Sequence, residues 1–154
     1  MAKEIERKFL VDLTKWGKVG KAIQMEQAYL SIENHKVVRV RIANDRAYLT
    51  IKGNLEGITR DEFEYEIPVS DAKQLMKMRV GYSIRKTRYV EEVKGKIWEV
   101  DVFEGENKGL VVAEIELESE NENFEKPIWA LDEVSTDERY YNFNLTHTPY
   151  SKWQ

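Results

Sequence analysis

Charged residues two positions apart recur along this chain of 154 residues. The acidic pairs are Glu4/Glu6, Glu62/Glu64, Glu99/Asp101 and Glu114/Glu116, and the basic pairs are Arg39/Arg41 and Lys86/Arg88, joined by Lys8 and Lys52. Residues two apart in a strand share one face. Carboxylates crowded on one face repel one another unless cations lie among them. The pattern therefore predicts a shared site that takes metal ions and a polyanion.

A simpler explanation is that these faces are the solvated side of an ordinary sheet, where ion pairs contribute little to stability. For any single strand this explanation is the more frequent one. Across the chain it is weaker, because seven of the eight predicted strands carry two or more charged residues at matching positions. A solvated face would accept Ser, Thr, Asn and Gln just as readily. The repetition favours convergence on a ligand.

The charged pairs fall in eight stretches that alternate apolar and polar residues: about 4–11, 26–33, 37–43, 46–52, 60–69, 82–91, 96–104 and 110–118. Turn residues such as Asn44-Asp45 and Lys94-Gly95 separate several of them. The fold class is therefore mainly β (α+β). If the eight antiparallel strands closed into a β-barrel, the charged faces would line a tunnel and the apolar faces would lie outside.

Two short helices are expected outside this barrel. Ser70 can cap a helix that places Ala72, Leu75, Met76 and Val80 on one face. A second helical piece is expected near 120–131, limited or begun by Pro127. The tail from Asp132 to residue 154 receives no predicted structure, and the whole chain, 1–154, is expected to form one domain.

The composition narrows the kinds of ligand. A net charge of −4 argues against a general nucleic-acid binder, and no apolar run is long enough to span a membrane. The chain also begins without a hydrophobic signal stretch, so a cytoplasmic location is expected. There is no cysteine, and the two histidines, His35 and His147, lie in a predicted turn and in the tail. A metal here should be bound by oxygen, which suits Mg²⁺ or Mn²⁺.

The charge of the predicted polar faces points to the same conclusion. Eight acids and six bases would leave the site at −2, whereas two bound divalent cations would make it +2 and attractive to phosphates. Arginine and lysine would then bind the phosphate oxygens.

Taken in order, these pairs and the segment Asp137-Glu138-Arg139-Tyr140 resemble the triphosphate tunnel metalloenzymes, also called the CYTH superfamily. The resemblance extends over nearly the whole chain, and among the members it favours the short bacterial-type inorganic triphosphatases. It implies an eight-stranded antiparallel barrel that forms a tunnel, with one or two Mg²⁺ or Mn²⁺ ions and a triphosphate substrate.

Carried over by position, the resemblance implies three sets of residues. The metal ligands would be Glu4, Glu6, Asp101, Glu114 and Glu116. The triphosphate would be bound by Lys8, Arg39, Arg41, Lys52, Lys86, Arg88 and Arg139. The catalytic candidates are Lys8, Tyr29, Glu62 and Glu64, of which the two glutamates are also candidates for metal binding. Tyr29 would orient water or phosphate with Lys8, although a tyrosine there is at least as often a packing residue.

The expected function is metal-dependent hydrolysis of inorganic triphosphate, with nucleoside triphosphates as further substrates. The alternatives are a class IV-type adenylate cyclase, a thiamine triphosphatase and, outside enzymes, a module that binds polyphosphate or nucleotide without turnover. The expected partner is the small-molecule triphosphate, with no nucleic acid and no membrane. Two short helices would cover little of the barrel, which favours a homodimer.

Overall fold

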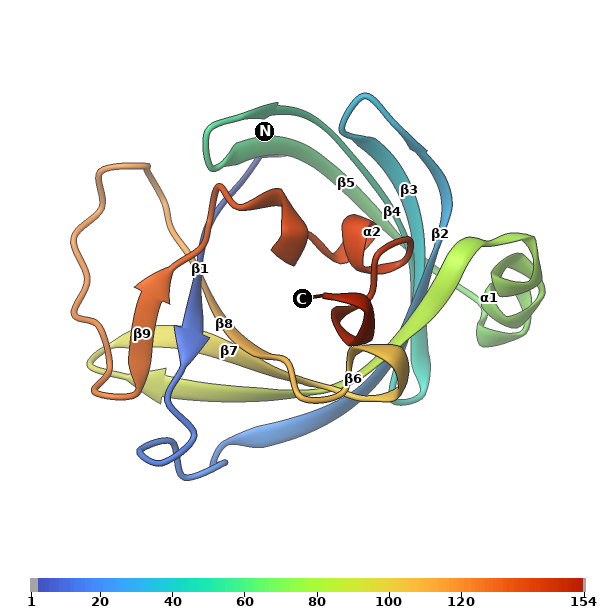
Figure 1. The fold of residues 1–154 in the computed structure, drawn as a ribbon. Coiled ribbons are helices and arrows are strands. Elements are labelled where there is room, and N and C mark those ends of the chain that lie inside the picture. Colours follow the sequence, from blue (N-terminus) through green and yellow to red (C-terminus); the bar gives the residue numbers. More distant parts are fainter. Residues whose placement is uncertain (1–2, 154) are drawn as a thin grey trace.

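The computed structural model describes residues 3–153, so residues 1, 2 and 154 at the ends of the expected domain lie outside the described residues. Its strands are β1 (Lys3–Val11), β2 (Lys21–Glu33), β3 (Lys36–Ala43), β4 (Arg46–Glu56), β5 (Thr59–Ile67), β6 (Val80–Val93), β7 (Lys96–Phe103), β8 (Val111–Glu116) and β9 (Ala130–Glu133). The first eight correspond to the eight predicted strands. Figure 1 shows them curving around a common axis.

The sheet closes on itself through β1. The hydrogen-bonded order is β5-β4-β3-β2-β6-β7-β8-β1-β9, and the first half of β1 also pairs with β5, for example Glu4 with Arg60. The second half of β1 pairs with the additional strand β9, for example Phe9 with Glu133. Each of these pairs of strands is antiparallel. The predicted closed eight-stranded antiparallel barrel is therefore confirmed, with one extra strand.

The outer face of the barrel is apolar, and different segments cover it. Over β1, β7 and β8, Trp98 is fully buried and contacts Trp129 and Phe124, with ring centroids 5.6 and 5.8 Å apart. Over β2 to β4, helix α1 (Val69–Leu75) and the 3₁₀ turn η1 (Met76–Met78) bury Ala72 and Met76. Because these contacts remove apolar area from water, they stabilise the closed ring.

Two predictions about helices were wrong. Residues 120–131 form no helix: they run as a loop into β9, since this segment buries Trp129 and packs the partly buried Phe124 against the barrel instead of forming its own amphipathic face. Ser70 does not cap α1, because the helix begins at Val69, with Pro68 at the N-cap position and no side-chain cap, so Ser70 already lies inside it. The fixed φ of Pro68, −60°, already suits the entry into a helix. No helix among residues 3–153 is long and apolar enough to cross a membrane.

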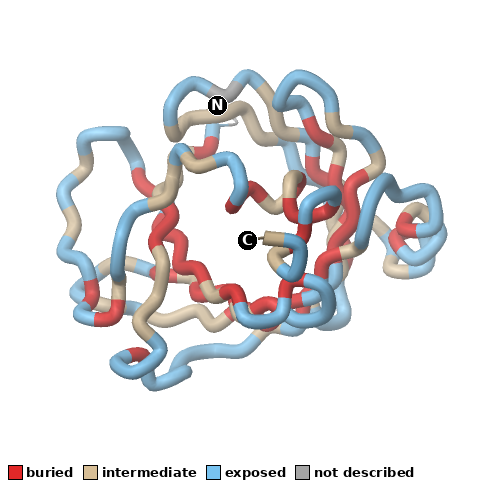
Figure 2. The backbone as a smooth tube through the Cα atoms, viewed as in Figure 1, coloured by how far each residue is buried: buried red, intermediate tan, exposed pale blue. Residues whose placement is uncertain are grey.

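The C-terminal tail, for which no structure was predicted, fills one end of the barrel. It contains η3 (Glu138–Tyr140), α2 (Asn142–Leu145) and η4 (Tyr150–Lys152), which lie across the barrel opening in Figure 1. Its apolar side chains pack with inward-facing strand residues, forming a cluster of Tyr29, Val37, Ile84, Phe103, Leu110, Val112, Tyr140, Tyr141, Phe143 and Leu145. Figure 2 shows buried residues both in this tail and along the adjacent walls. We call residues 138–146 the plug.

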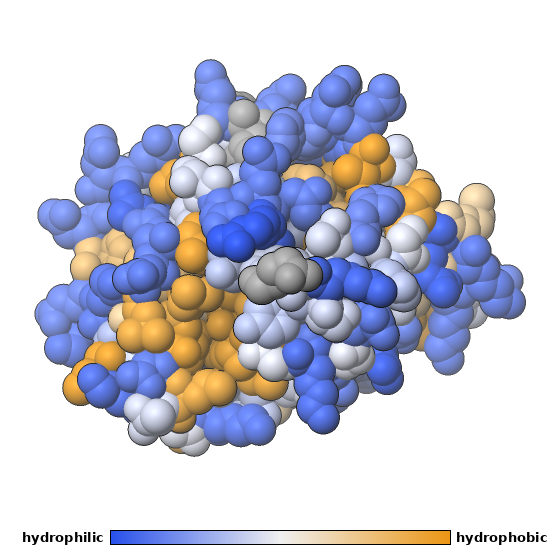
Figure 3. Space-filling view, in the orientation of Figure 1, coloured by the Kyte–Doolittle hydropathy of each residue, from blue (hydrophilic) through white to orange (hydrophobic). Residues whose placement is uncertain are grey.

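The solvent-facing surface of the whole molecule, including the segments that cover the barrel, is largely hydrophilic on the face viewed in Figure 3, with apolar residues gathered at the lower left. On the outer face of β4 and β5, three apolar residues stay partly exposed: Ile51 at 43%, Phe63 at 47% and Tyr65 at 58%. No segment within residues 3–153 buries them. This is the part of the barrel that the short helices leave uncovered.

Gly81 fixes the plug against β6 and provides a test of that contact. Its φ is +70°, and a Cβ there would lie 2.5 Å from the carbonyl oxygen of Thr146, which accepts a hydrogen bond from the Tyr82 N–H. We expect Gly81→Ala to lower the free energy of unfolding by roughly 2–4 kcal/mol in urea denaturation, from backbone strain and the clash. The control is Gly95→Ala, at φ +80° with no atom within 4 Å of the new Cβ. Equal losses in the two variants would contradict close packing of the plug.

Candidate active site

The open half of the barrel encloses a cavity of about 220 Å³ whose wall is formed mainly by charged side chains. Seven acidic and seven basic residues line it: Glu4, Glu6, Glu62, Glu64, Glu99, Glu114 and Glu116, and Lys8, Arg39, Arg41, Lys52, Arg60, Lys86 and Arg88. They come from β1 and β3 to β8, at the alternate positions that face inward. The structure thus brings together most of the residues that the sequence grouped by position.

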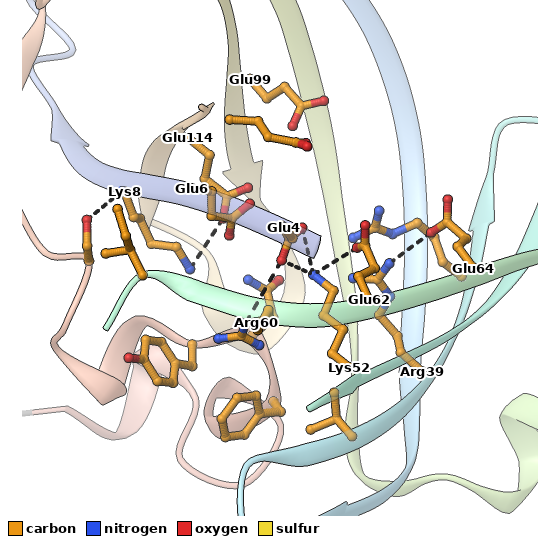
Figure 4. A pocket seen from close by; sticks show the side chains of 18 of the residues that line it. Glu4, Glu6, Lys8, Arg39, Lys52, Arg60, Glu62, Glu64, Glu99 and Glu114 are labelled. Atoms are coloured by element: carbon orange, nitrogen blue, oxygen red, sulfur yellow. Dashed lines mark hydrogen bonds and ion pairs between the residues drawn. The ribbon is translucent and has the colours of Figure 1, made fainter. Parts of the chain in front are cut away.

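Lys52 lies among the carboxylates at one side of the cavity (Figure 4). Its Nζ donates to both oxygens of Glu4, at 3.0 and 3.1 Å, and lies 3.4 Å from Glu62. Arg60 approaches the same Glu4 carboxylate at 3.9 Å. Burial alone would raise the pKa of Glu4, but the attraction of Lys52 outweighs it and the pKa is lowered. Glu4 is therefore held as a carboxylate by protein cations.

The neighbouring carboxylates are less well compensated. Glu6 and Glu116 are direct partners in the β1–β8 ladder. Burial and then the charges of Glu114 and Glu4 raise the pKa of Glu6 well above its usual range. Burial and then Glu4 and Glu62 raise the pKa of Glu116. These acids resist being ionised together, and a bound cation would relieve that repulsion.

Asp101, predicted as a metal ligand, lies behind the cavity wall and is fully buried. One of its oxygens accepts from Arg88 Nε at 2.8 Å, and the other accepts from Arg88 Nη2 at 3.0 Å and Lys86 Nζ at 2.7 Å. Burial would raise its pKa, but the two cations lower it. Both oxygens are thus occupied by protein donors, and the structure does not bring Asp101 to the cavity surface. Within residues 3–153, no group of three acidic or histidine side chains is arranged to hold a metal ion.

Arg41 is the cation in the cavity wall with the least compensation. Its Nε donates to the amide oxygen of Gln27 at 2.8 Å, and it takes part in no ion pair formed among residues 3–153. Burial, followed by the charges of Arg39 and Arg88, lowers the pKa of Arg41 to about 9. A half-buried guanidinium that lines a cavity and is not itself paired with a carboxylate is suited to bind an anion.

Arg39 lies on the same strand as Arg41 but, unlike Arg41, contacts a carboxylate of residues 3–153. Its Nη2 donates to Thr50 Oγ1 at 3.1 Å and lies 3.5 Å from Glu64. The Thr50 hydroxyl donates in turn to Glu64 at 2.8 Å. The Nε of Arg39 is buried without a hydrogen-bond partner in the described structure. Two guanidiniums on β3 therefore retain unused donors near the cavity.

Two predicted residues are placed differently from the rest. Arg139 lies on the surface, outside the cavity lining, where its guanidinium pairs with Asp137 at 2.7 Å. Tyr29 lines the cavity but packs edge-on against Phe143 of the plug, with ring centroids 6.4 Å apart. The ring of Tyr29 is therefore part of the wall between the charged cavity and the apolar plug.

Sequence reasoning missed Arg60 and the residues of the plug. Arg60 has the same parity in β5 as Glu62 and Glu64, so the alternation itself could have identified it. Tyr141 and Asn142 also line the cavity. The guanidinium of Arg60 lies 5.7 Å from the ring centroid of Tyr141. No periodic signal in the tail could have placed these two residues in the site.

A closed antiparallel barrel with a cavity lined by acids and bases is the arrangement expected of the triphosphate tunnel fold. The family model described as the CYTH domain matches residues 2–149. The chain belongs to the CYTH domain family, as the resemblance of its motifs predicted.

Its relatives include proteins named inorganic triphosphatase. The one from Acetivibrio thermocellus is 46% identical over 155 residues, which cover 100% of this chain and 99% of that protein. The one from Nitrosomonas europaea is 34% identical over 143 residues, with coverage of 90% and 93%. A crystal structure described as an inorganic triphosphatase superposes with a TM-score of 0.69 at 33% identity and covers 95% of both chains.

The buried ion pairs of Asp101 should contribute to the stability of the fold. Asp101→Asn leaves the buried Lys86 without an ion-pair partner among residues 3–153 and removes from Arg88 the closest of the three carboxylates that it contacts there, so we expect the free energy of unfolding to fall by roughly 3–5 kcal/mol in urea denaturation. The matched control is Asp61→Asn, since Asp61 pairs with Lys3 at the surface and its loss should change stability far less. Similar losses in the two variants would show that Asp101 is not the counter-charge of the two cations.

Proposed function

We propose that this protein hydrolyses inorganic triphosphate to pyrophosphate and phosphate, with Mg²⁺ or Mn²⁺ as the metal. The observation that carries the proposal is the wall of the cavity, where fourteen of the twenty-two lining residues are charged and the half-buried Arg41 forms no ion pair with any carboxylate of residues 3–153. A site of this composition recognises a chain of phosphates through its oxygens. The relatives named inorganic triphosphatase, which cover nearly the whole chain, support the same substrate.

The residues fit a divalent cation by their chemistry. Glu4, Glu6, Glu114 and Glu116 offer carboxylate oxygens on the wall of one cavity. Burial and, after it, repulsion by other acids raise the pKa of Glu6 and Glu116, and a cation would remove that repulsion. We assign the metal to these four glutamates and leave Asp101 out, because Asp101 does not line the cavity and its two oxygens accept from Lys86 at 2.7 Å and from Arg88 at 2.8 Å. Glu114 lines the cavity and its contacts with Arg88 and Lys8 are longer, at 3.3 and 3.5 Å. When bound, the metal would neutralise phosphate charge and increase the acidity of a coordinated water.

The basic residues would bind and orient the phosphates. Arg39, Arg41 and Arg60 offer planar donors that can grip two oxygens at once, while Lys8, Lys52, Lys86 and Arg88 add positive charge around them. Lys52 would exchange its bond to Glu4 for one to a phosphate oxygen, which also releases Glu4. These contacts hold the terminal phosphorus in place for attack by water.

Glu62 is suited to accept the proton of that water. Burial and then the charge of Glu4 raise its pKa, which makes its carboxylate the stronger base. Glu64 is less available, because the Thr50 hydroxyl and Arg39 bind it. As the water oxygen bonds to the terminal phosphorus, the bond from that phosphorus to the bridging oxygen breaks and pyrophosphate leaves with the electron pair.

The alternatives make different products, so one set of assays separates them. Phosphate release should be measured from tripolyphosphate, ATP and thiamine triphosphate, with Mg²⁺ or Mn²⁺ and with a chelator, alongside cyclic AMP. We expect tripolyphosphate to be cleaved fastest and the chelator to abolish cleavage. Cyclic AMP from ATP would overturn the proposal in favour of a cyclase. Tight binding without turnover of any substrate would indicate a binding module.

The homodimer expected from the sequence stays a prediction. The exposed Ile51, Phe63 and Tyr65 on the outer face of the barrel are consistent with it. Sedimentation of the protein would give its mass relative to the 18.2 kDa of one chain.

Arg41→Ala tests the substrate-binding role. Losing charge-assisted hydrogen bonds to a phosphate should raise KM for tripolyphosphate about 10- to 100-fold, with a smaller change in kcat. Arg46→Ala is the control, because Arg46 is exposed, pairs with the exposed Glu66 and does not line the cavity, so its loss should leave the kinetics unchanged. A normal KM in the Arg41 variant would remove the central support for an anion site.

Glu116→Gln tests the metal assignment. The substitution keeps the size of the side chain but removes a charged ligand, so half-saturation should need at least about ten times more Mg²⁺ or Mn²⁺, and kcat should fall. The matched control is Glu118→Gln, two residues along the chain and exposed, which should leave the metal titration unchanged. Identical metal titrations for wild type and the Glu116 variant would place the metal elsewhere.

A further inference from the structure

A chain of hydrogen bonds links two cations of the cavity through two uncharged amides. Arg41 Nε donates to Gln27 Oε1 at 2.8 Å, and Gln27 Nε2 donates to Asn142 Oδ1 at 3.1 Å. Lys86 Nζ donates to the same Asn142 oxygen at 3.0 Å. Gln27 is fully buried and Lys86 is 1% exposed. The links join the neighbouring strands β3 and β2 to the plug and to β6, and Gln27 and Asn142 are 115 residues apart in the sequence.

The chemistry of the two ends fixes the orientation of both amides. A guanidinium can only donate, so Gln27 must present its oxygen to Arg41, and its NH₂ then faces Asn142. An ammonium can also only donate, so Asn142 must present its oxygen to Lys86. That one oxygen satisfies both donors, and reversing either amide would break the chain.

The same chain continues beyond Lys86. Lys86 Nζ also donates to Asp101, which binds Arg88 through both oxygens. Lys8 is tied to the plug separately, since its Nζ donates to the carbonyl oxygen of Tyr140 at 2.9 Å. The plug therefore accepts hydrogen bonds from two cations of the cavity, Lys86 and Lys8, as well as closing the barrel.

We propose that Gln27 and Asn142 are positioning residues that hold Arg41 and Lys86 ready to receive the phosphate chain. This inference rests on the proposed function. Long side chains lose rotamer freedom when they bind a ligand, and fixing them beforehand reduces that loss on binding. Amides suit this task because they accept hydrogen bonds without a negative charge that would compete with phosphate for the two cations.

Kinetics with tripolyphosphate test the effect on the substrate. Asn142→Ala should raise KM about tenfold, as expected for one lost hydrogen bond to a charged group, with kcat within about twofold of wild type. The matched control is Asn144→Ala on the same helix, because Asn144 donates to the carbonyl oxygen of Glu138 and does not contact the chain. It should leave KM unchanged. Equal KM increases in both variants would show that loosening of the plug, and not positioning, is the cause.

A double-mutant cycle tests whether the two amides act as one unit. Gln27→Met should raise KM about as much as Asn142→Ala, and combining them should add less than about twofold. Multiplication of the two single effects would overturn the proposal. If the Asn142 variant fails to fold, the Gln27 variant still tests the same link from the barrel wall.

Hydrogen exchange of the Arg41 Nε–H, followed by NMR in the ligand-free protein, tests the chain without any substrate. We expect slow exchange in wild type and Asn144→Ala, and faster exchange in Asn142→Ala and Gln27→Met. Unchanged exchange in Asn142→Ala would overturn the inference whatever the protein cleaves. Failure of wild type to cleave tripolyphosphate would instead overturn the proposed function and leave the exchange result standing.

Discussion

The fold and the site both depend on mutual compensation of charge inside a closed barrel. Removing a carboxylate or an ammonium from water is costly unless an opposite charge or several hydrogen bonds replace the solvent. Here Asp101 binds Arg88 and Lys86, and Lys52 binds Glu4. Among the described residues, compensation is incomplete at two places, the crowded acids around Glu6 and Arg41, whose guanidinium has no carboxylate partner there. Those are the places where a cation and an anion would complete it.

The barrel makes this arrangement feasible because it separates two kinds of surface. Alternate residues of each barrel strand face the lumen, so charged residues at every second position point inside. The apolar residues between them point outward and pack under α1 and the loop that carries Trp129. The lumen is divided again along its axis. The plug fills one end with apolar side chains, and the charges occupy the other. The apolar plug limits the access of water to the buried ion pairs, which strengthens their electrostatic interactions.

Much of the site could be predicted because strand geometry is local. The inward direction of Lys8, Arg39 and Glu114 can be read from the sequence, because side chains alternate between the two faces of a strand. The same rule would have found Arg60. It could not distinguish Asp101 from the cavity acids, since parity gives the side of the sheet but not the depth behind the wall. It also could not place Arg139, whose position depends on the path of the tail.

The sequence by itself determined the eight strands, the inward direction of their charged residues and the membership of the CYTH family, because these follow from a period of two and from motifs in a fixed order. Only the tertiary structure decided which charges neutralise one another, where β9 pairs, and that the plug supplies Asn142 and Tyr141 to the cavity. Some of these contacts join segments more than a hundred residues apart, as between Gln27 and Asn142, and all of them depend on how the strands are brought together in space, which no local pattern encodes.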